Sequence, residues 1–113
     1  MPLYQTATAY QAHRAMLRTV RAHAVITSAA RTTTRTTAAR VVARARHAAH
    51  DAARLDTRAQ DEHARAVNEY RYPFSAYVNL TRQSAAEAHA DALTARDAMR
   101  DMIRSAQILY PKH

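Results

Sequence analysis

The sequence predicts an all-α protein, either a small bundle or an extended arrangement of about three long helices. About a quarter of the residues are alanine, glycine is absent, and proline occurs only at positions 2, 73 and 111. Alanine is the best helix former, and glycine and proline are the strongest local breakers. No segment pairs an alternating strand with a turn, as a hairpin requires. Because 113 residues suit one core, we expect a single helical domain over residues 1–113.

The first helix is expected from about residue 4 to residue 30, because Pro2 suits a first helical turn. Apolar residues recur there at helical period and predict a stripe along one face, made of Leu3, Tyr10, Met16, Leu17, Val20 and Ala24. The threonine-rich run at 32–37 is a weak helix former, since β-branched side chains lose rotamer freedom in a helix. We therefore expect a break in that run.

The second helix is expected from about residue 38 to residue 70, and Pro73 should end it. One predicted face is charged and consists of Arg40, Arg44, His47, Asp51, Arg54, Arg58, Asp61 and Arg65. The opposite face is small and apolar and consists of Ala38, Val41, Ala45, Ala49, Ala52, Ala59 and Val67. This division predicts a solvent-facing or ligand-facing side opposite a packing side.

The third helix is expected from about residue 84 to residue 109. Ser84 and Glu87 have the spacing of a capping box, in which each side chain satisfies a free backbone N–H at a helix start. Its predicted packing face consists of Ala92, Ala95, Met99, Met102, Ala106 and Leu109. Pro111 should stop the helix.

The net charge of +8 is unevenly divided along the chain. Residues 1–50 hold eight arginines and no acid, whereas residues 51–113 hold nine basic residues and nine acids. An acid-free basic half predicts an acidic partner: nucleic acid, an anionic protein or membrane surface, or an import receptor. Residues 3–46 also have the arginine-rich, hydroxyl-rich and acid-poor composition of a mitochondrial targeting segment. No transmembrane or secretory segment is expected.

Enzymatic chemistry is not expected. Cysteine and glycine are absent, which excludes thiol nucleophiles and glycine-rich phosphate loops. His47, His50 and Asp51 share one helical turn, but this cluster is a weak zinc signal, so we expect no metal and no cofactor. Large apolar residues are scarce as well, and an alanine-rich core gains little from burial. The sequence thus favours a protein that packs against other subunits.

Two sets of residues are the candidates for partner binding. Arg14, Arg18 and Arg21 form a line beside Tyr10 and Leu17, where their stems can cover apolar surface while the guanidinium groups meet an acidic partner. The second set is a candidate polyanion-binding surface and consists of Arg31, Arg35, Arg40, Arg44, Arg54, Arg58 and Arg65. Arginine binds phosphate in a bidentate way, so this set suits a nucleic-acid backbone.

The segment at 12–21 resembles the opening helix of the LYR-motif family of small mitochondrial helical proteins. Arg14, Met16, Leu17 and Arg18 match the family pattern, while Ala12 and His13 stand where the family has leucine and tyrosine. Arg71-Tyr72-Pro73 followed by Tyr77 is similar to a corner in a complex I member of the family.

The resemblance implies an accessory or assembly subunit on the mitochondrial matrix side, with Arg14 and Arg18 helping to dock an acidic acyl carrier protein. The alternative is a nucleic-acid-coating protein of a virion or nucleoid, such as a helical viral coat subunit. Self-association stays open under both interpretations.

Overall fold

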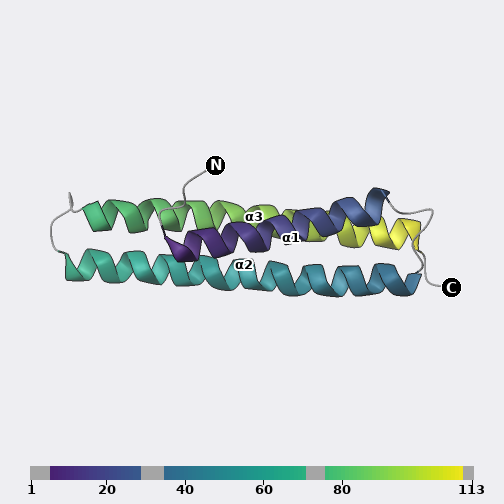
Figure 1. Cartoon of the computed structure of the whole chain (residues 1–113), viewed down its shortest axis with the longest axis horizontal. Helices are drawn as coiled ribbons and strands as arrows, with labels where there is room; N and C mark the ends of the chain where they lie inside the picture. Colours follow the sequence, from purple (N-terminus) through teal and green to yellow (C-terminus); the bar gives the residue numbers. More distant parts are fainter. Residues whose placement is uncertain (1–5, 29–34, 71–75, 111–113) are drawn as a thin grey trace.

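The protein is an all-α three-helix bundle (Figure 1). A computed structural model describes residues 6–28, 35–70 and 76–110. The helices are α1 (Ala7–Ser28), α2 (Arg35–Glu69) and α3 (Ala76–Leu109). Within the described ranges only Thr6, Tyr70 and Tyr110 lie outside a helix, and no strand occurs. The predicted fold class is therefore confirmed.

The bundle is long and flat, with principal extents of 60 × 28 × 15 Å. α2 and α3 run antiparallel along its whole length, and α1 lies against both (Figure 1). The 22-residue α1 is shorter than its neighbours and begins level with Glu62 of α2 and Ser84 of α3. The hydroxyls of Thr6 and Ser84 hydrogen-bond at 2.5 Å, and Thr8 donates a 2.5 Å hydrogen bond to Glu62. The end where α2 leads to α3 thus projects beyond α1.

The core consists mainly of alanine. The fully buried alanines include Ala12, Ala15, Ala52, Ala88 and Ala95, each 0% exposed. Alanine lets the helices approach closely but removes only one methyl group each from water. The larger buried apolar groups are Met16, Ile26, Leu55, Val78, Met99 and Met102. Because burying a leucine or isoleucine contributes about 1.5–3 kcal/mol, these few side chains supply much of the apolar driving force.

The core-facing side of α1 differs from the predicted apolar stripe. Of that stripe only Met16 is buried, whereas Leu17 is half-buried and Tyr10 and Val20 are exposed; Leu3 lies outside the described residues. The buried face is instead Thr8, Ala9, Ala12, Ala15, Met16, Thr19 and Ile26. Five of these seven residues are alanine or threonine, whose short side chains fit where α1 lies against two helices at once; Met16 and Ile26 are the larger members.

The structure corrects the start of the second helix by three residues. α2 begins at Arg35, so Thr36 and Thr37 are helical, while the first part of the threonine run lies outside the described residues. The predicted small face is buried at Ala45 and Ala52, but Val67 is 46% exposed because it lies beyond the reach of α1. α2 ends at Glu69 and α3 begins at Ala76, on either side of the expected break at Pro73, which itself lies outside the described residues.

The predicted capping box at Ser84 and Glu87 is wrong. α3 begins eight residues earlier at Ala76, and no glycine or proline interrupts it before Ser84. Ser84 is buried inside the helix, where its hydroxyl meets Thr6 of α1 rather than a free N–H at a helix start. Leu109, assigned to the packing face, is 41% exposed at the last turn.

Polar contacts between helices fix their alignment along the long axis of the bundle. Between α1 and α3, the His13 Nδ1 atom lies 3.4 Å from an Asp91 carboxylate oxygen. Between α3 and α2, His89 Nδ1 lies 3.1 Å from a carboxylate oxygen of Asp56. Gln60 Nε2 donates a 3.1 Å hydrogen bond to the carbonyl of Ala85. Burial raises the pKa of Asp91, and the charge and hydrogen bond of His13 oppose that rise only in part.

Asp91→Asn is expected to stabilise the fold at pH 7. Because the folded pKa of Asp91 lies above the unfolded value of 3.8, the folded state binds the proton more tightly. Protonated Asp91 therefore contributes fully to the stability of the fold below the unfolded pKa of 3.8. This contribution is lost as the pH rises through the higher folded pKa. Urea unfolding at pH 7 and at pH 3.5 should show a gain for the variant at pH 7 that shrinks in acid. A lower free energy of unfolding for Asp91→Asn at pH 7 would contradict this account.

Candidate functional site

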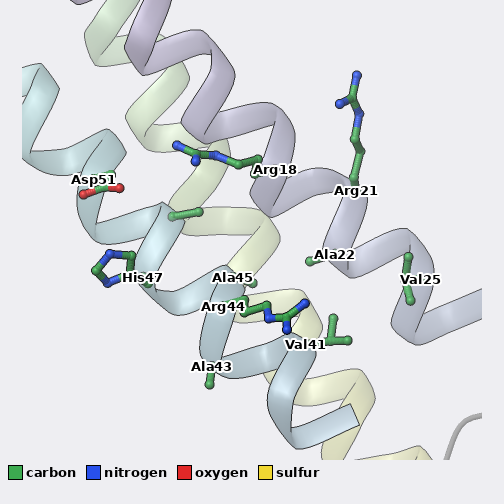
Figure 2. A pocket seen from close by; sticks show the side chains of 11 residues that line it. Arg18, Arg21, Ala22, Val25, Val41, Ala43, Arg44, Ala45, His47 and Asp51 are labelled. Atoms are coloured by element: carbon green, nitrogen blue, oxygen red, sulfur yellow. The ribbon is translucent and has the colours of Figure 1, made fainter. Parts of the chain in front are cut away.

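A groove of about 710 Å³ runs between α1 and α2 (Figure 2). Its apolar lining is supplied by Ala22, Val25, Val41, Ala43, Ala45 and Ala48. Val25 is 45% exposed, so part of this apolar surface faces the solvent. The groove forms here because alanine and valine side chains leave a shallow gap between two adjacent helices.

Three arginines stand at the groove: Arg18 and Arg21 from α1, and Arg44 from α2. Arg18 extends toward the stretch of α2 that carries Asp51, whereas Arg21 projects away from α2 (Figure 2). Within the described residues none of the three takes part in an ion pair. Asp51 also lines the groove, and its carboxylate lies 3.7 Å from Arg54. The groove is thus apolar inside, cationic at its edge and open to a partner.

The fold concentrates positive charge in one half of the bundle, which we call the basic half: residues 14–28, 35–50 and 95–110. This half holds ten arginines and two aspartates. The other described residues, the acidic half, hold four arginines and seven acids. The sequence predicted a basic half from residues 1–50 alone. The sequence did not predict that arginines 96, 100 and 104 of α3 also lie in the basic half. They lie there because α3 runs antiparallel to α2.

The remaining members of the first candidate set, Tyr10, Arg14 and Leu17, do not line the groove. The guanidinium carbon of Arg14 lies 5.8 Å from the centre of the Tyr10 ring, a cation–π geometry on the α1 surface. Tyr10 is 48% exposed. Leu17 packs against the core cluster that contains Met16 and is not a free apolar contact.

The second candidate set does not form one continuous surface. Arg54 and Arg58 are paired with Asp51 and Glu62, at 3.7 and 3.5 Å. Arg65 shares a hollow with Asp61 and Glu62. The others separate: Arg44 joins the α1 groove, Arg35 lines a groove between α2 and α3, Arg40 is exposed, and Arg31 lies outside the described residues.

The histidine cluster and the aromatic corner do not form further sites among the described residues. His47 and Asp51 line the groove, yet no group of three or more potential metal ligands occurs among the described residues. Tyr70 and Tyr77 form a tilted aromatic pair with ring centres 5.2 Å apart at the α2–α3 end, while residues 71–75 of the predicted corner lie outside the described part. No helix in the described ranges is apolar enough over a sufficient length to cross a bilayer.

The fold and groove define a class: a small all-α protein with a cationic groove between two helices. No protein-family model, curated protein or solved structure matches the chain.

Proposed function

We propose that this protein is a non-enzymatic accessory subunit of a larger assembly, and that the groove between α1 and α2 docks an acidic partner protein. One observation carries the proposal: Arg18, Arg21 and Arg44 line an apolar groove and have no ion-pair partner among the described residues. An acidic side chain beside an apolar contact would satisfy both properties of this surface. The alanine-rich core supports the same conclusion, because further burial against a partner would add stability.

The resemblance at residues 12–21 suggests which assembly this is. A LYR-like subunit would act on the matrix side of mitochondria, with an acidic acyl carrier protein as partner. Of the four residues that match the family pattern, Arg18 is the one that lines the groove. Arg14, the other matching arginine, instead lies against Tyr10. We therefore assign the main contact to Arg18 and the supporting contacts to Arg21 and Arg44.

Nucleic-acid coating is the alternative function. The ten arginines of the basic half favour it, since phosphate neutralisation needs charge rather than a shaped pocket. The pairing of Arg54 and Arg58 with acids on the same helix weakens it, because those arginines are already partly neutralised.

A pull-down separates the two functions. Arg18→Ala/Arg21→Ala/Arg44→Ala should lose an acidic protein partner identified by mass spectrometry. Arg54→Ala/Arg58→Ala/Arg65→Ala, with the same charge change on α2 outside the groove, should retain it. Unchanged recovery of every protein by the groove variant would refute the proposal. Recovery of nucleic acid alone, with log affinity falling by about 0.9 per phosphate per log unit of salt, would establish the alternative.

A further inference from the structure

A second groove runs along the seam between α2 and α3, and we call it the α2–α3 groove. It consists of two hollows of about 590 and 430 Å³ that share Arg46, and no described residue of α1 lines either hollow. The groove therefore lies on the side of the α2–α3 pair that α1 does not cover. Its lining residues recur every three or four positions, at Val42, Arg46 and Ala49 of α2 and at Met99, Ile103 and Ala106 of α3. The groove thus follows the helix axes.

The floor of the α2–α3 groove is apolar and has room for a further helix. Val42, Ile103 and Met99 lie along it, and Leu93 near one end is 36% exposed. The exposed alanines 39, 43 and 53 on the α2 edge let a neighbouring helix approach closely. On α2 the lining extends over residues 35–56, a rise of about 32 Å at 1.5 Å per residue. The groove therefore matches a helix of about 20 residues.

Arginines stand on both edges of this floor. Arg35 and Arg46 line the groove from α2, and Arg96 and Arg100 line it from α3. Arg35, Arg46 and Arg100 are exposed and take part in no ion pair among the described residues. Arg96 lies 3.6 Å from Asp97, but both side chains are exposed, so this pair holds the arginine only weakly.

The acid among the described lining residues, Asp56, does not neutralise these arginines. One of its carboxylate oxygens accepts a 3.1 Å hydrogen bond from Gln60 Nε2, and the other lies 3.1 Å from His89 Nδ1. The carboxylate is thus directed to contacts within the bundle. The α2–α3 groove is left with an apolar floor and a positive charge on each edge, and its occupant must answer both.

We infer that the α2–α3 groove binds an acidic amphipathic helix of a partner protein. The apolar stripe of such a helix covers the floor, and carboxylates on both sides of the stripe meet Arg46 and Arg100. A sugar-phosphate backbone would answer the arginines but leave the apolar floor uncovered. The 22-residue α1 already packs against both α2 and α3, so the bound helix completes a four-helix arrangement. The inference goes beyond the proposed function, because neither Arg18 nor Arg44 lines this groove.

A pair of synthetic peptides tests the chemistry of the occupant. The probe is a helical peptide of about 20 residues with leucine at every third or fourth position and glutamate on both sides of that stripe. The control peptide has the same composition with its leucines spread around the helix. Fluorescence anisotropy should find one-to-one binding of the probe, and affinity for the control that is lower by about tenfold or more. Absence of probe binding, or equal affinity for both peptides, would overturn the inference.

Methyl NMR spectra locate the bound probe. The probe should shift the methyl signals of Val42, Met99 and Ile103, whereas shifts of Val25 and Val41 report the groove between α1 and α2. Shifts confined to Val25 and Val41 would overturn the inference. The Val42, Met99 and Ile103 shifts should persist in Arg18→Ala/Arg21→Ala/Arg44→Ala, so a failure of the proposed docking groove is separable from a failure here. Their loss in that variant would also contradict the assignment.

Charge reversal on the two edges tests the arginines. Arg46→Glu/Arg100→Glu should raise the dissociation constant of the probe by about tenfold or more. Arg40→Glu/Arg104→Glu makes the same charge change at exposed positions of the same helices that line neither hollow, and should weaken binding much less. Circular dichroism checks that both variants are folded. Equal weakening would overturn the inference. Wild-type dimers in sedimentation velocity that only Arg46→Glu/Arg100→Glu dissociates would assign the groove to a second copy instead and also overturn it.

Discussion

Ala88→Leu is expected to lower the free energy of unfolding by about 1–3 kcal/mol. Ala88 is 0% exposed and packs in the core cluster with Ala12, Leu55 and Ala59. Its small size holds α3 close to α1 and α2, so three added carbon atoms must push the helices apart or force strained rotamers. Since 1 kcal/mol corresponds to about 4–8 °C in a domain of 60–100 residues, the melting temperature should fall measurably.

The matched control is Ala90→Leu on an exposed turn of the same helix. Leucine and alanine have similar helix propensities, so the two variants differ mainly in burial. Thermal unfolding followed by circular dichroism should show a large loss for Ala88→Leu and a change within about 0.5 kcal/mol for Ala90→Leu. Equal effects at both positions would mean that the alanine-lined contact between helices is not tightly packed.

The helical fold was predictable because composition alone removes the alternatives. Glycine is absent and proline occurs at only three positions, so the chain has few strong helix breakers. Pro73 falls between the end of α2 and the start of α3, whereas the interval between α1 and α2 holds no proline and includes the first threonines of the threonine-rich run. The start of α3 was not predictable from local pattern. Ser84 and Glu87 have the capping-box spacing, but the hydroxyl of Ser84 meets Thr6, a residue 78 positions away. A local motif cannot reveal a contact over that distance.

The candidate site was predictable in part. Periodicity placed Arg18 and Arg21 on one edge of the first helix, and placed Arg44 on a charged face of the second. Arg18 and Arg21 meet Arg44 at one groove because of the rotation of α1 about its own axis relative to α2. This rotation buries Ala12 and Ala15 rather than Tyr10 and Leu17. In an alanine-rich helix several faces have similar hydrophobicity, so the sequence does not determine this rotation. The packing of α1 against both α2 and α3 determines it.

Arg18→Glu/Arg21→Glu is expected to abolish binding of the acidic partner. Truncating one side of a desolvated charge pair costs about 2–5 kcal/mol, and charge reversal adds repulsion of the opposing acid. Affinity should therefore fall by at least about 30-fold, since 1.4 kcal/mol corresponds to tenfold. Both side chains are exposed and unpaired among the described residues, so the fold should be unaffected. Calorimetry with the purified partner measures the loss.

Arg54→Glu/Arg58→Glu is the control with the same change in net charge. These arginines lie on α2 outside the groove, beside Asp51 and Glu62. If the partner responds only to the overall charge of the bundle, both double variants should weaken binding equally, and high salt should remove the difference from wild type. If the groove is the docking site, only Arg18→Glu/Arg21→Glu should abolish binding. Its defect should also persist at high salt, because a charge buried against the apolar floor of Val25 and Val41 is screened much less than one in solvent.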